Sequence, residues 1–143
     1  GAGLDQRDMT GMKRTDIVDH GEQGIEITVR GNRPRSVLLR AEWEDTLREG
    51  LAGLRAKTHI LGKAEPAKDY IGDLYSTHLR CLEGRAHVTQ SRLRNTWLTT
   101  LIGEPISLWT IMQAAGLATA RTLVELTRFL TPTSDSHLTR GAQ

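Results

Sequence analysis

The sequence predicts an α+β fold that is mostly helical and contains a small antiparallel β-hairpin. Residues 24–30 alternate apolar and polar side chains with a period of two, which is typical of a half-buried strand. A turn cluster at 31–34 separates them from a second apolar run at 36–39. Residues 91–130, in contrast, carry apolar side chains at helical spacing with glycine-containing breaks between them. At 143 residues the chain can bury one core without disulfides or metals.

The remaining elements follow in chain order. Helices are expected over residues 5–13, 41–56, 67–82 and 91–102, then over a segment ending at 114–116 and over 119–130. A short strand is expected at 59–61, and the three tryptophans lie on apolar helix faces, so we expect them in the core. The polar segment 131–143 is expected to be a flexible tail, which leaves residues 1–130 as one domain.

The charge pattern leaves two explanations open. The formal net charge is only +2, although the sequence pI is near 9.0. Only four of the 19 basic residues are lysines. Arginine is favoured for phosphate and nucleic-acid contacts, but a GC-rich genome enriches arginine as well.

Several classes of protein are excluded by what the sequence lacks. Its single cysteine, Cys81, excludes an internal disulfide and fits the reducing cytoplasm, so a cytoplasmic location is expected. The apolar runs are too short to span a membrane, and we expect no membrane partner. The five histidines lack metal-site spacing, and the N-terminal Gly-x-Gly has no strand before it, so neither metal nor cofactor is expected. The chain starts abruptly without an initiator Met, and we expect a preceding N-terminal part.

Residues 3–17 align without a gap to the pattern Gly-Leu-Arg-x-Ser-Glu-Leu-x-x-Leu-x-Trp-x-Asp-Ile. Gly3, Leu4, Asp16 and Ile17 match this pattern, which resembles the first box of the tyrosine recombinase (phage integrase) catalytic domain. The resemblance covers residues 3 to about 130 and implies the fold of that domain. At the position of the first catalytic arginine, however, this chain has Asp5.

The other boxes occur in the expected order. Residues 29–37 are similar to the family segment Gly-Lys-Gly-x-Lys-x-Arg-x-Val, with Arg30 at the catalytic lysine. In the box that begins at Ser91, Arg94 stands at the second catalytic arginine. The other catalytic positions hold residues of different chemistry, namely Ser91 and Leu117 at histidines and Leu126 at the nucleophilic tyrosine.

These changes predict a loss of catalysis. The family attacks a DNA phosphodiester with a tyrosine, while arginines and histidines stabilise charge on the phosphoryl oxygens. Asp5 would repel that phosphate, and the chain has no tyrosine after Tyr75. We therefore expect a protein that is not an enzyme. An active recombinase that uses Tyr70 or Tyr75 in a rearranged site is the remaining alternative.

DNA binding is the function that the resemblance leaves in place. The candidate contacts to the DNA backbone are the arginines of the hairpin and of the Ser91 helix, namely Arg30, Arg33, Arg35, Arg92 and Arg94. The expected partner is double-stranded DNA, together with a second copy or an active integrase, in a DNA-binding or recombination-associated regulatory role. The alternative is a protein-interaction or structural domain that has lost DNA binding. For Arg94 the sequence leaves two interpretations, a surviving phosphate contact or a side chain paired with Asp5 or Asp8. We predict that it is at least partly buried and paired with one of these two residues.

Overall fold

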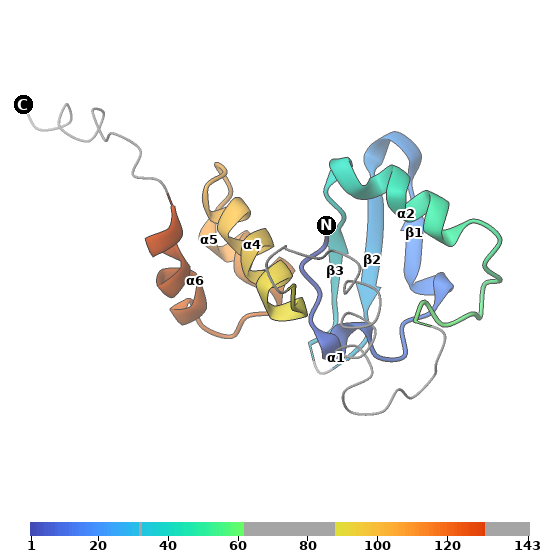
Figure 1. Ribbon diagram of the computed structural model, residues 1–143, viewed down its shortest axis with the longest axis horizontal. Helices are drawn as coiled ribbons and strands as arrows, with labels where there is room; N and C mark the ends of the chain where they lie inside the picture. Colours follow the sequence, from blue (N-terminus) through green and yellow to red (C-terminus); the bar gives the residue numbers. More distant parts are fainter. Residues whose placement is uncertain (32, 62–87, 131–143) are drawn as a thin grey trace, which may run out of the picture.

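The sheet of this protein is a three-stranded antiparallel meander. The computed structural model describes residues 1–31, 33–61 and 88–130. Strands β1 (Ile17–Asp19), β2 (Ile25–Val29) and β3 (Arg35–Leu38) are paired in the order β1-β2-β3 (Figure 1). The predicted hairpin is confirmed as β2 and β3, and β1 is an additional strand. In register, Ile27 lies opposite Ile17 on one side and Val37 on the other, and all three are buried.

The rest of the fold is mainly helical, as predicted. The helices are α1 (Gln6–Met9), α2 (Glu44–Leu51), α4 (Gln90–Ile102), α5 (Leu108–Ala115) and α6 (Arg121–Leu126). Figure 1 shows α2 lying over one face of the sheet, whereas α4, α5 and α6 are grouped beyond the β3 edge. Short 3₁₀ turns at Ala41–Trp43 and Thr127–Phe129 lead into α2 and extend α6.

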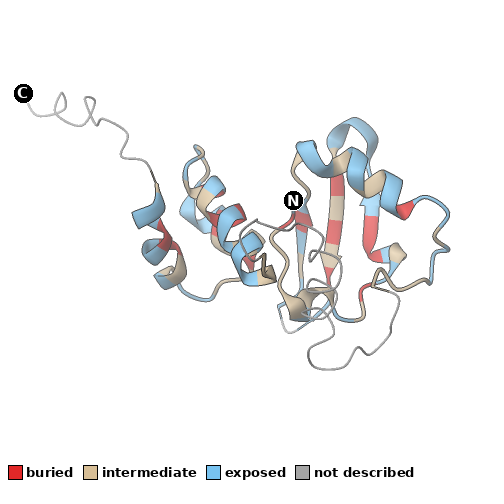
Figure 2. Ribbon diagram, viewed as in Figure 1, coloured by how far each residue is buried: buried red, intermediate tan, exposed pale blue. Residues whose placement is uncertain are grey.

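One apolar core joins the sheet to the helical group. Ile25 of β2, Leu98 of α4, Ile111 of α5 and Leu123 of α6 are all at most 2% exposed and belong to the same cluster. Figure 2 shows the buried positions along β2 and on the inner sides of these helices. Because the core is continuous, residues near the N-terminus are held against α4 and α5.

Two helices are shorter than the periodicity predicts. The helix expected over 5–13 is limited to α1, because the chain turns at Gly11 with a positive φ of 72°. The helix expected over 41–56 ends at Leu51, just before Gly53 with a φ of 78°. At 59–61 there is only an isolated bridge between Lys13 and His59 in place of a strand.

The tryptophan prediction is correct for one residue of three. Trp97 is buried, but Trp43 and Trp109 are 48% and 68% exposed, because each lies at the start of its helix and faces away from the core. The expected helix over 67–82, Tyr70 and Tyr75, and the expected tail 131–143 lie outside the described residues.

Candidate functional site

A nearly buried carboxylate, that of Asp8, lies where α1, β3 and α4 meet. Arg35 of β3 donates to both of its oxygens, from Nη1 to Oδ1 over 3.1 Å and from Nη2 to Oδ2 over 2.6 Å. The backbone N–H of Asp5 donates to Oδ2 over 3.0 Å, and Nη1 of Arg94 lies 4.0 Å from the same oxygen. The side chains of Asp8 and Arg35 are each 10% exposed, and that of Arg94 is 14% exposed. Both carboxylate oxygens of Asp8 therefore accept hydrogen bonds from groups of the protein.

The same arginines hold the C-terminal end of α5. Nε of Arg35 donates to the carbonyl of Ala114 over 2.8 Å, and Nη2 of Arg94 donates to that of Ala115 over 2.5 Å. Arg33 donates to the carbonyl of Gly116. These carbonyls carry the partial negative charge of a helix C-terminus, so cationic donors stabilise them. Three arginines thus cap one helix end.

The charged groups of this cluster shift one another's pKa values. Burial by itself raises the pKa of Asp8, but hydrogen bonds from Arg35 and from the Asp5 backbone outweigh it, and the pKa lies below its ordinary value. For Arg94, burial is the largest effect and lowers the pKa, while attraction to Asp5 and Asp8 opposes it. Both groups remain charged at neutral pH. The site is a buried ion cluster whose donors are used internally.

The two remaining candidate arginines lie apart from this cluster. Arg30 is 71% exposed and donates from Nε to Oδ1 of Asp16 over 2.5 Å, whereas the Asp16 side chain is only 4% exposed. Arg92 is exposed on α4 and lines a different groove, together with Leu126 and Phe129. The five arginines therefore do not form one continuous face, and their role in DNA binding stays a prediction.

The other residues at the family's catalytic positions cap a helix, lie in a first helical turn or pack in the core. Asp5 is the N-cap of α1, and its Oδ1 accepts a hydrogen bond from the Asp8 N–H over 2.9 Å. Ser91 is exposed in the first turn of α4. Leu117 is partly buried against the core, and Leu126 is buried within it.

One sequence prediction is confirmed and one contact was missed. Arg94 is largely buried and paired with Asp8, as one of the two interpretations predicts. The tighter partner of Asp8, however, is Arg35, which the sequence assigns only to a basic hairpin. These residues are 27 positions apart. Asp8 aligns with a glutamate of the family's first box and Arg35 with an arginine of the hairpin segment, but the alignment alone does not pair them.

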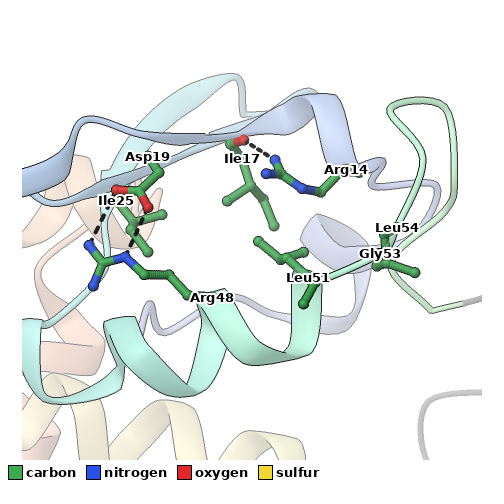
Figure 3. A pocket seen from close by; sticks show the side chains of 9 residues that line it. Arg14, Ile17, Asp19, Ile25, Arg48, Leu51, Gly53 and Leu54 are labelled. Carbon is green, nitrogen blue, oxygen red and sulfur yellow. Dashed lines mark hydrogen bonds and ion pairs between the residues drawn. The ribbon is translucent and has the colours of Figure 1, made fainter.

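A second polar site lies between β1 and α2, around a cavity of about 420 Å³ (Figure 3). There Arg48 of α2 donates to both oxygens of Asp19, and Arg14 donates to the carbonyl of Ile17 over 2.8 Å. Figure 3 shows Leu51 between these two arginines. None of the residues predicted from the sequence to form a site lines this cavity, and its ion pair ties α2 to the sheet.

Within the described ranges, no group of three histidine, cysteine, aspartate or glutamate side chains is arranged to hold a metal ion. The helices in these ranges are also too short or too polar to cross a membrane.

Comparison with known proteins supports the fold. No protein-family model matches this sequence, and no curated protein matches it either. The structure is similar to the crystal structure of XerA recombinase, with a TM-score of 0.59 and 16% sequence identity. The similar region covers 92% of this chain and 53% of that one, so the chain spans about half the length of XerA. At this identity the likeness shows a recombinase-like fold.

Proposed function

We propose that this chain is a catalytically inactive, tyrosine-recombinase-like domain that binds DNA as a recombination-associated protein. The recombinase-like fold supports the general role. The observation that carries the proposed loss of catalysis is Asp5, which stands at the position of a phosphate-binding arginine and caps α1. A carboxylate there repels a scissile phosphate, and the buried Leu126 at the position of the nucleophile has no hydroxyl to attack it.

The DNA-facing surface in this proposal is the hairpin tip and not the buried cluster. Arg30 and Arg33 are exposed there, and Gly31 between them lies against the backbone of Arg7, which is also exposed on α1. Exposed guanidinium groups on neighbouring segments suit contacts with successive phosphates. Such contacts carry no sequence information, so the binding is nonspecific.

Fluorescence anisotropy with a labelled DNA duplex tests this proposal. We expect a Kd on the order of 10⁻⁴–10⁻⁶ M that weakens steeply as salt rises, because binding releases counterions. The double variant Arg30→Glu/Arg33→Glu should abolish the signal. Its circular dichroism spectrum must remain that of the wild type, because Arg30 also pairs with Asp16 and Arg33 also donates to the Gly116 carbonyl. Arg121→Glu is the matched control, since Arg121 is 85% exposed on α6 and pairs with its helical neighbour Glu125. Equal loss in the control, or no binding by the wild type at low salt, would reject DNA binding.

A protein-interaction domain is the second candidate, favoured by apolar side chains on the helical group. Large exposed residues occur on α5, on α6 and just after it, namely Leu108, Trp109, Val124 and Phe129. Exposed apolar side chains mark an interaction site where they form one contiguous patch. Sedimentation velocity of the wild type and of Trp109→Ala separates the two candidates. Concentration-dependent association that the variant loses, without DNA binding, would favour the interaction domain.

A further inference from the structure

We propose that the cavity between β1 and α2 binds a small monocarboxylic acid with an apolar body, and that Arg14 holds its carboxylate. The cavity measures about 420 Å³. Small-molecule sites in proteins measure roughly 300–1,000 Å³, so this space is large enough for a ligand. None of its lining residues belongs to the Asp8 cluster or to the hairpin tip. The site therefore does not depend on DNA binding.

The positive charge of Arg14 is not neutralised within the described part of the chain. Arg14 is half-buried and donates from Nη1 to the carbonyl of Ile17 over 2.8 Å, but it forms no ion pair with a described residue (Figure 3). In the pattern that residues 3–17 resemble, position 14 is a tryptophan, so this charge departs from that pattern. The N–H groups that Ile17 does not take can donate a pair of hydrogen bonds to a carboxylate.

The other arginine of the cavity, Arg48, is already neutralised. It donates to both oxygens of Asp19 over 2.9 and 3.2 Å, and it also donates to Glu44 and Asp45. Among the described lining residues, a ligand therefore meets one unpaired guanidinium, that of Arg14. One guanidinium suits one carboxylate, whereas a phosphate dianion would bring a second negative charge close to Asp19. The charge pattern favours a monoanion.

The walls of the cavity fit an apolar ligand body. Figure 3 shows Leu51 between the two arginines, and Ile17 and Leu54 line the same space. At Gly53, a Cβ would meet no atom within 4 Å, so the backbone there borders open space. Covering apolar side chains removes their surface from water, which favours binding. An alkyl chain attached to the carboxylate at Arg14 can do this, and hexanoate has both parts.

NMR titration of residues 1–143 with sodium hexanoate, at neutral pH and constant ionic strength, tests the site. Backbone amide signals report both weak binding and its position. We expect saturable shifts at amides around the cavity, namely those of Ile17, Leu51, Gly53 and Leu54, with a Kd on the order of 10⁻³ M. Acetate has the charge without the chain, and hexanol has the chain without the charge. Each should bind at least about tenfold more weakly than hexanoate.

The variant Arg14→Met removes the charge and keeps an unbranched apolar side chain. It should weaken hexanoate binding at least about tenfold. Arg55→Met is the matched control, because Arg55 is exposed, lies one position beyond Leu54 and does not line the cavity. This control removes the same charge from a neighbouring segment, so it should bind hexanoate as the wild type does.

Several results would overturn the proposal. Absence of saturable shifts at the cavity amides would reject the site. Binding of acetate or hexanol as tight as that of hexanoate would reject the ligand class, as would tighter binding of inorganic phosphate. A folded Arg14→Met that binds hexanoate as well as the Arg55→Met control would reject the role of Arg14. If Arg14→Met loses the wild-type circular dichroism spectrum, the comparison of the ligands on the wild type decides.

Discussion

The guanidinium group of Arg35 makes four hydrogen bonds, two to Asp8 and one each to the carbonyls of Ala114 and Arg33. Replacing it by alanine leaves a buried carboxylate without its main partner, which costs roughly 3–5 kcal/mol. Arg94→Ala should cost less, about 1–3 kcal/mol, because Arg94 mainly satisfies buried carbonyls and lies farther from Asp8.

Urea unfolding of both variants measures these losses. The control is Arg121→Ala, which removes an exposed arginine and should change the free energy of unfolding by less than about 0.5 kcal/mol. A loss below about 1 kcal/mol for Arg35→Ala would show that its ion pair is solvated in solution.

The pKa of Asp8 predicts how stability depends on pH. Its pKa in the folded protein lies below the ordinary value of 3.8, because the Arg35 and backbone hydrogen bonds outweigh burial. The unfolded chain therefore takes up a proton first as pH falls. The stabilisation from Asp8 is fully present above about pH 4 and is lost as pH falls through the lower folded pKa.

Comparison of wild type and Asp8→Asn by urea unfolding from about pH 6 to about pH 2.5 tests this expectation. The stability difference between them should be constant at the upper end and shrink below about pH 4. A difference that stays constant across the whole range would show that Asp8 has the same pKa in the folded and unfolded states.

At the scale of single elements, the C-terminus of α5 requires a glycine at position 116. Gly116 caps the helix with a φ of 63°, and a Cβ at this position would lie 2.8 Å from Nη1 of Arg35. Gly116→Ala must therefore adopt a left-handed conformation and also displace an arginine of the buried cluster. The conformational part alone costs of order 1–3 kcal/mol.

Gly53→Ala separates the conformational cost of a positive φ from the cost of displacing Arg35. Gly53 has a similar φ of 78°, and a Cβ there would meet no atom within 4 Å. This variant should show the conformational cost alone, so thermal unfolding of Gly116→Ala should show a larger loss of stability. Equal losses would mean that Arg35 adjusts freely and does not hold the end of α5 rigidly.

The elements that the sequence predicted well are those with strong local periodicity. Alternation in 24–30 and 36–39 specifies β2 and β3, and the apolar spacing in 91–130 specifies α4 to α6. β1 has three residues, of which Ile17 alone is buried, so it carries no alternation to detect. Its position is fixed by pairing with β2, which is a tertiary effect.

At the scale of the whole molecule, the site was predictable in position but not in its partners. Alignment to the recombinase boxes places Asp5 and Arg94 at one site, and the structure brings them together through α1 and α4. The alignment gives Arg35 a DNA-facing role, whereas packing of β3 against α5 turns its side chain toward Asp8. Such long-range pairing is set by the assembled fold and leaves no local signal in the sequence.

The last prediction concerns catalysis by residues 1–143. A nicked suicide duplex, which traps covalent recombinase–DNA intermediates, should give no adduct that survives denaturing electrophoresis. Leu126 is buried in the core at the position aligned with the nucleophile, and Asp5 replaces a phosphate-binding arginine. Leu126→Tyr alone should not restore the adduct, because nucleophile and charge-stabilising groups act as a unit. An active tyrosine recombinase serves as the positive control. An adduct formed by the wild type and lost in Tyr70→Phe or Tyr75→Phe would instead establish a rearranged, active site.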